Sequence, residues 1–198
     1  MAKVVKFPVQ PPEKFGFRPV RKKREEPTPR SPQLNLFAGA KIVKLGRLTP
    51  FEEALILDEN NDKSAKEHYL KAIKDGDSVA DAYCNLGIIE SKLKNYPKAI
   101  DAFTLSLKED PRHFESHYNL ANLYAEIGNL PLAKIHYHMS INIEPEFPNG
   151  YFNLGLTLAM NQEIDEAIQM LLEYPRLTTA DDLAQVDELI TYLSQSGR

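Results

Sequence analysis

The chain has 198 residues, of which 24 are Lys or Arg and 28 are Asp or Glu, so its formal net charge is -4. That length allows one domain with appendages, because a domain usually takes roughly 100–200 residues. The single Cys84 excludes an intramolecular disulfide framework and a zinc site built on paired thiolates. The sequence has neither a secretory signal pattern nor an apolar run near the roughly 18 residues that span a bilayer, which predicts a cytoplasmic protein.

Residues 1–48 are predicted to form a disordered, proline-rich basic arm. Seven of the 14 prolines lie between positions 1 and 32, and proline removes a backbone donor and favours extended conformations. Residues 1–37 carry nine basic and three acidic side chains, a net charge of +6, which leaves -10 for residues 38–198. The arm and the rest of the chain are therefore expected to attract each other, and salt should weaken that attraction.

Four consecutive cations lie in this arm: Arg21, Lys22, Lys23 and Arg24. Such a run can bind a phosphate backbone, an acidic protein or an anionic membrane. Two glutamates, Glu25 and Glu26, follow at once and weaken its field, so a solvated charge cluster is the alternative. The run makes nucleic acid a candidate partner.

The arm also contains the short motif QLNLF at residues 33–37, with the candidate contact residues Gln33, Leu34, Leu36 and Phe37. The motif resembles the clamp-binding pentapeptide of bacterial replication and repair proteins. In such a ligand the glutamine is a polar anchor, while leucine and phenylalanine fill an apolar pocket. The alternative is that these apolar side chains pack on the first helical hairpin.

Helical signals begin near residue 49. Thr49, Pro50 and Glu52 predict an N-cap, a first helical position and the acid of a capping box. A second helix is predicted to begin at Asp62, and Gly76 is predicted to end it in a left-handed conformation.

A 34-residue period follows, and it is the strongest signal in the sequence. Asn85, Asn119 and Asn153 lie within the similar stretches YCNLG, HYNLA and YFNLG, each one period after the last. A period of this length and content resembles the tetratricopeptide repeat, a helix-turn-helix unit. In the repeat from 80 to 113 the family pattern falls on Tyr83, Leu86, Gly87, Ala99, Phe103 and Pro111.

The resemblance implies an all-α solenoid of stacked hairpins over residues 49–177. Its repeats are 46–79, which is degenerate, 80–113, 114–147 and 148–177. Small residues such as Gly87 and Ala99 would let the two helices of a hairpin approach closely. Apolar residues at helical spacing between Leu183 and Leu193 predict a C-terminal capping helix within residues 178–198.

The resemblance also implies a concave groove, lined by the first helix of each hairpin and suited to an extended peptide. The groove positions would be Asp81, Asn85, Ile88, Glu115, Tyr118, Asn119, Asn122, Phe152 and Asn153. We call Asn85, Asn119 and Asn153 the asparagine ladder. An amide both donates and accepts, so the ladder could pair with a peptide backbone of any sequence. The alternative is that these asparagines only form hydrogen bonds within the repeats.

The charges in this groove predict the character of its ligand. Chaperone-binding members of the family clamp a C-terminal carboxylate with Lys and Arg, whereas the matching positions here include Asp81 and Glu115. A C-terminal acidic ligand is therefore disfavoured, and a basic or apolar protein or peptide is expected. The chain's own basic arm is one candidate ligand for the groove. A separate possibility is that the chain self-associates through an exposed end of the solenoid.

The sequence contains no recognised catalytic motif or phosphate-binding loop. His113 and His117 are four positions apart, but no third ligand is placed to complete a metal site. We therefore expect neither a metal nor a cofactor, and interpret the chain as a non-enzymatic protein-binding adaptor. The alternative is an accessory factor for replication or nucleic acids that uses the run 21–24 and the motif 33–37.

Overall fold

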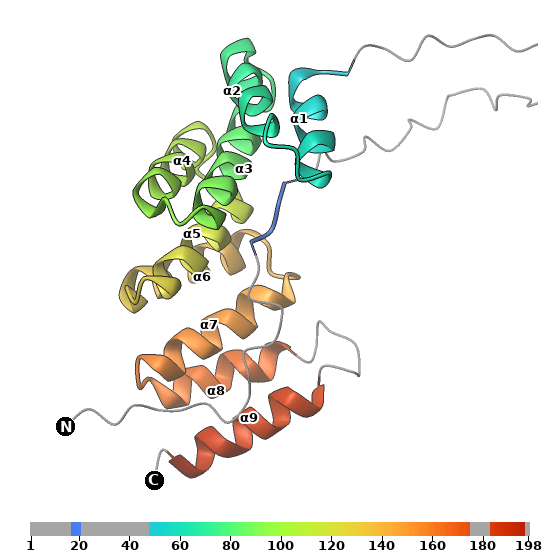
Figure 1. The fold of residues 1–198 in the computed structure, drawn as a ribbon. Coiled ribbons are helices and arrows are strands. Elements are labelled where there is room, and N and C mark those ends of the chain that lie inside the picture. The colour runs from blue at the N-terminus through green and yellow to red at the C-terminus, as the bar shows by residue number, and fades with distance from the viewer. Residues whose placement is uncertain (1–16, 21–47, 175–182, 197–198) are drawn as a thin grey trace, which may run out of the picture.

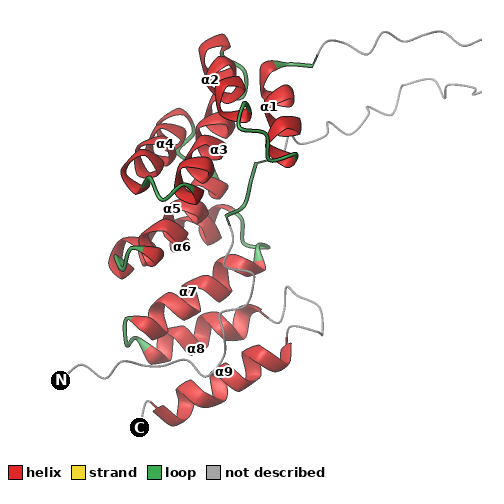
Figure 2. Cartoon of the chain, viewed as in Figure 1, coloured by secondary structure: helices red, strands yellow, loops and turns green. Residues whose placement is uncertain are grey.

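The computed structural model describes residues 17–20, 48–174 and 183–196, and these are all helical or irregular (Figures 1 and 2). The QLNLF motif and the run from 21 to 24 lie outside the described residues. The helices are α1 (Pro50–Glu59), α2 (Ala65–Asp75), α3 (Val79–Lys92), α4 (Tyr96–Glu109), α5 (Phe114–Glu126), α6 (Leu130–Ile143), α7 (Pro148–Met160), α8 (Ile164–Glu173) and α9 (Leu183–Ser196). The predicted all-α solenoid is confirmed.

Local signals set the ends of the first hairpin. The Glu52 backbone N–H donates to the Thr49 hydroxyl, and the Thr49 N–H donates to the Glu52 carboxylate, which completes the predicted capping box. Gly76 ends α2 with φ of 75°, as predicted. The predicted start of α2 at Asp62 is wrong, because the helix begins at Ala65. The Asp62 carboxylate accepts from both the backbone N–H and the hydroxyl of Ser64, so it stabilises a turn before the helix.

Consecutive helices pair into antiparallel hairpins, α1 with α2, α3 with α4, α5 with α6, and α7 with α8. Glycine permits the close approach in two of them. A Cβ added at Gly87 would lie 2.6 Å from a ring carbon of Phe103, and one added at Gly155 would lie 2.7 Å from Cγ of Leu171. The interiors of these two hairpins therefore require the small residues that the repeat pattern places there.

The last helix, α9, packs against α8 and covers the end of the array. Val186, Leu189 and Leu193 of this helix are buried. The helix begins at Leu183, whereas the predicted capping segment began at 178, and residues 175–182 lie outside the described part of the chain. Among the described helices, none combines the length and apolarity needed to cross a membrane.

Candidate functional site

Four residues of the arm lie against the first helices of two neighbouring hairpins. We call Phe17–Val20 the docked segment. It runs as a non-helical stretch of chain along the inner side of the curved array (Figure 1). Val20 meets α3 and Arg18 meets α5, so the docked segment runs opposite to the order of the repeats.

Two asparagines of the ladder hold this segment by its backbone. The Val20 N–H donates to Asn85 Oδ1 at 2.9 Å, and Asn85 Nδ2 donates to the Val20 carbonyl at 3.1 Å. The Arg18 N–H donates to Asn119 Oδ1 at 2.7 Å, and Asn119 Nδ2 donates to the Arg18 carbonyl at 2.9 Å. Each amide thus pairs in both directions with one residue of the segment. Because these contacts reach only backbone atoms, they do not depend on the segment's side chains.

Buried neighbours orient both amides. Asn85 and Asn119 are fully buried. The second N–H of Asn85 donates to the Tyr69 hydroxyl at 3.1 Å, and Asn119 Nδ2 lies 3.4 Å from Cys84 Sγ. Burial raises the pKa of Cys84 to about 12, so this cysteine is a neutral thiol and a packing residue at neutral pH.

The side chain of Val20 enters the apolar interior between α3 and α5. Val20 is only 6% exposed and belongs to one buried cluster with Cys84, Ile88, Leu120 and Leu123, among others. Phe17 packs on the edge of the same cluster. The predicted groove residue Ile88 thus lies at the point where Val20 is buried.

The guanidinium of Arg18 lies over two aromatic rings. Its Cζ is 4.5 Å from the ring centroid of Phe147 and 4.9 Å from that of Phe114, distances typical of cation–π contacts. Burial raises the pKa of the neighbouring Glu115, and the positive charge of Arg18 partly opposes that rise. We call Phe114, Phe147 and Glu115 the cation site.

The other acidic groove residue, Asp81, lies beside a buried histidine. Its Oδ1 is 2.9 Å from His113 Nε2, and His113 Nδ1 accepts from the Ser116 backbone N–H. His113 thereby caps the start of α5. Glu115 Oε2 lies 3.8 Å from His113 Nδ1, so both acidic positions that the sequence singled out lie beside this histidine. Within the described helices, no Lys or Arg forms an ion pair with either carboxylate.

The third asparagine of the ladder is arranged differently. Asn153 is fully buried, and its Nδ2 donates to the Tyr118 hydroxyl and to Asn122 Oδ1, both at 3.0 Å. Asn122 Oδ1 also accepts from the Tyr137 hydroxyl. Among the described residues, the Oδ1 atom of Asn153 has no hydrogen-bond partner. Tyr118 and Asn122, both predicted groove residues, therefore belong to a side-chain network between the repeats.

The predicted groove residue Phe152 packs against the end of α8. Phe152 is 4% exposed, and its ring lies 5.3 Å from that of Tyr174 at the end of α8. Conversely, the sequence reading missed Phe114 and Phe147. The sequence offered one signal for this pair. Both residues lie at the start of the first helix of a hairpin, 33 positions apart, which is one position short of the 34-residue period.

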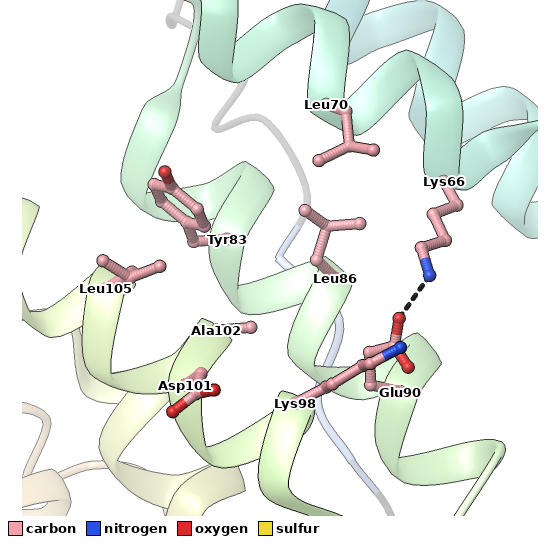
Figure 3. A pocket seen from close by; sticks show the side chains of 9 residues that line it. All are labelled: Lys66, Leu70, Tyr83, Leu86, Glu90, Lys98, Asp101, Ala102 and Leu105. Atoms are coloured by element: carbon pink, nitrogen blue, oxygen red, sulfur yellow. Dashed lines mark hydrogen bonds and ion pairs between the residues drawn. The ribbon is translucent and has the colours of Figure 1, made fainter. Parts of the chain in front are cut away.

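Two other features resemble ligand sites. His117 and His136 approach to 3.0 Å between their Nδ1 atoms, but the described residues contain no group of three metal-ligating side chains. A shallow hollow between α2, α3 and α4 is lined mainly by apolar side chains, and an ion pair between Lys66 and Glu90 crosses one side of it (Figure 3). Leu86 and Glu90 lie on this hollow, whereas Asn85 holds the docked segment.

Comparisons with known proteins agree with this architecture. Two models of the tetratricopeptide repeat match residues 80–113 and 102–135. The human Protein O-mannosyl-transferase TMTC3 is 32% identical over 148 residues, which cover 73% of this chain but only 16% of that protein. The chain thus spans about a sixth of the length of this curated relative.

Solved structures share the fold at low identity. MamA from Desulfovibrio magneticus RS-1 is 16% identical, with a TM-score of 0.64 over 74% of this chain and 82% of that one. The first tetratricopeptide domain of Spaghetti (RPAP3), bound to the HSP90 peptide SRMEEVD, is 19% identical, with a TM-score of 0.55 over 59% of this chain and 91% of that one. The TPR2B domain of yeast Sti1, in a complex with pHsp70, is 20% identical, with a TM-score of 0.54 over 59% and 97%.

Proposed function

We propose, from the premise that this chain belongs to the tetratricopeptide-repeat family, that it is a non-catalytic adaptor binding an extended segment of a partner protein in its concave groove. The observation that carries the proposal is the paired hydrogen bonding of Asn85 and Asn119 to the backbone of the docked segment. A groove that holds one extended segment by its main chain can hold others of similar shape.

The free energy that holds the docked segment is small, which suits exchange with a partner. Its four backbone hydrogen bonds contribute about 0.5–1.5 kcal/mol each, and burial of Val20 contributes about 1.5–3 kcal/mol. Fixing the backbone of its four residues costs about 1–2 kcal/mol each. Because these opposing contributions are of similar size, a competing segment can replace Phe17–Val20.

Two of the structural neighbours are complexes, one with an HSP90 peptide and one with pHsp70. Those proteins support peptide binding as the use of the fold. The HSP90 peptide ends in EEVD, whereas the predicted groove positions of this chain include the acidic residues Asp81 and Glu115. We therefore propose a partner that is basic or apolar. No contact of a described residue favours the alternative role in replication or nucleic-acid binding.

The test is a titration of the full chain with a labelled peptide that carries residues 14–23, KFGFRPVRKK, followed by fluorescence anisotropy. The chain carries Val20→Asp, so that its own segment is disabled. Replacing Asn85 and Asn119 together by Ala should weaken binding at least tenfold, because four hydrogen bonds are lost.

Asn60→Ala is the matched control. Asn60 is exposed and donates only to its own helix, at the Ile56 carbonyl, so its loss should leave the affinity unchanged. Circular dichroism should show the same helix content in all variants. If the double asparagine variant binds as tightly as its parent, the ladder does not hold the peptide and the proposed function is wrong.

A further inference from the structure

We propose that Phe17–Val20 is a tethered copy of a partner motif, and that the groove selects extended segments in which arginine is followed by proline and a small aliphatic residue. This inference rests on the proposed function and names the class of partner. The hydrogen bonds from Asn85 and Asn119 reach only the backbone of the segment, so they do not discriminate between sequences. Selectivity must therefore come from contacts with the side chains of the bound segment.

The aliphatic position is the most demanding. Val20 is 6% exposed among Cys84, Ile88, Leu120 and Leu123, and Cys84 and Leu123 are themselves fully buried. A carboxylate at this position would have to leave water for an apolar site that Asp81 and Glu115 already make unfavourable for negative charge. A larger side chain would meet a closely packed interior. The site therefore fits valine and residues close to it in size and polarity.

The arginine position is set by the cation site. The guanidinium of Arg18 contacts the faces of Phe114 and Phe147, and Phe147 is 8% exposed. A planar guanidinium stacks on aromatic faces better than an ammonium does, which favours arginine over lysine. Glu115 lies nearby with a side chain that is 17% exposed, so an acidic residue at this position would be repelled.

Proline fits between these two positions for a conformational reason. The ladder bonds Arg18 and Val20 but leaves the residue between them unbonded, and Pro19 is exposed there. Proline has no N–H to lose, and it biases the residue before it towards extended conformations. A segment with proline here is partly ordered before it binds, so less entropy is lost on binding.

The tether explains how one chain can hold such a motif and still serve a partner. A ligand joined to its own receptor has an effective concentration on the order of mM for a short linker. A partner with the same motif must compete with that local copy. Weakening the copy should therefore expose the groove and raise the apparent affinity for the same motif supplied in trans.

The experiment compares the wild-type full chain with its Val20→Asp variant, using the labelled KFGFRPVRKK peptide and single substitutions of it. We expect the variant to bind this peptide at least tenfold more tightly than the wild-type chain does. A peptide with Arg18→Ala should bind about fivefold more weakly, one with Arg18→Lys should be intermediate, and one with Val20→Asp should not bind measurably. The chain variant Arg18→Ala, a milder way to weaken the copy, should also bind more tightly than wild type.

Each outcome decides a different point. If no chain binds any of the peptides, the proposed function itself fails. If the substituted peptides bind as well as the parent, the groove binds segments without this selectivity, and the inference is overturned while the proposed function stands. If wild-type and variant chains bind equally, Phe17–Val20 is not a competing copy.

Light scattering tests whether the segment binds its own chain or a second copy. The wild-type chain should be a monomer over a range of concentrations. A wild-type dimer that the Val20→Asp substitution converts to a monomer would show that the segment binds a second copy instead.

Discussion

The two ends of the asparagine ladder differ although their asparagines occupy the same position of the repeat. Asn85 and Asn119 each give one N–H to the docked segment, whereas both N–H groups of Asn153 are used by Tyr118 and Asn122. The difference lies in the preceding repeat. Asn122 occupies the repeat position that Ile88 holds one repeat earlier, and Ile88 has no polar group to offer Asn119. A neighbouring repeat thus determines whether a ladder position is available to a ligand.

The hairpins at the two ends of the ladder, α3 with α4 and α7 with α8, both rely on a glycine for the close approach of their helices. The prediction with the largest expected effect tests this similarity. Gly87→Val and Gly155→Val would each drive a side chain into the facing helix, at Phe103 and Leu171 respectively. Each should lower the free energy of unfolding by about 3 kcal/mol. Urea denaturation followed by circular dichroism measures both. A loss at one end only would show that the two hairpins do not rely on the same close approach.

Exchanging residues between the repeats should convert the third ladder position into an open one. Asn122→Ile would leave the buried Tyr137 hydroxyl without this acceptor and should lower stability by about 1–3 kcal/mol. Adding Tyr137→Phe should restore most of the lost stability, because it removes the unpaired hydroxyl. The equivalent residue of the earlier repeat is also a phenylalanine, Phe103.

Binding provides the second readout for this exchange. The double variant frees one N–H of Asn153, whose Oδ1 accepts no hydrogen bond from the part of the chain that the structure describes. Two peptides are compared, KFGFRPVRKK and a shorter one that starts at Phe17, and all chains carry Val20→Asp. The ratio of the affinity for the longer peptide to that for the shorter one should be about fivefold larger in the double variant than in the parent chain. An unchanged preference would show that Asn153 cannot reach a ligand backbone even without Asn122.

Acid should affect the middle repeat in particular. His117 stands where the flanking repeats have Tyr83 and Tyr151, and its ring contacts His136. Burial, together with His117, lowers the pKa of His136 from 6.5 to about 4. Because the pKa is lower in the folded chain, His136 takes up its proton at a higher pH in the unfolded chain than in the folded one. The free energy of unfolding therefore keeps its full value above about pH 6.5 and falls as the pH drops towards 4.

The expected loss is roughly 1–2 kcal/mol, because the ring is only partly shielded from solvent. Urea titrations at pH 7 and pH 4.5 measure it. The double variant His117→Tyr and His136→Ala, which carries the residues of the repeat 80–113 at both positions, should lose less stability over the same range. An equal loss would assign the acid sensitivity to other groups.

Much of this arrangement could be predicted from the sequence, and the missing parts have physical reasons. The 34-residue period indicates the hairpins, the ladder and the small residues at Gly87 and Gly155, because repeating packing requires repeating residues. The basic arm was a predicted candidate for the groove. The register of Phe17–Val20 could not be predicted, because it depends on one buried valine and on the cation site, whose two phenylalanines are spaced one position short of the period and so fall outside it.

The Asn153 network was missed for a different reason. Its hydrogen bonds join residues 31 and 35 positions apart in neighbouring repeats. Which partner an amide chooses depends on the geometry of side chains that the repeat pattern leaves variable. The pattern fixes the position of each asparagine but not its partners, so Asn85, Asn119 and Asn153 looked alike in the sequence.

The smallest expected effect separates the charged contact of the docked segment from its neutral contacts. Arg18 is an exposed residue over aromatic rings near Glu115, whereas Val20 and the ladder are buried and uncharged. Salt screens exposed charges, with a Debye length of about 10 Å at 0.1 M and about 3 Å at 1 M. Raising the salt concentration over this range should weaken binding of KFGFRPVRKK to the Val20→Asp chain about threefold. The Arg18→Ala peptide should lose less, so the two affinities should converge. If both peptides weaken in parallel, the salt dependence arises from the flanking cations Lys14, Arg21, Lys22 and Lys23, and Arg18 contributes through its contact with the rings alone.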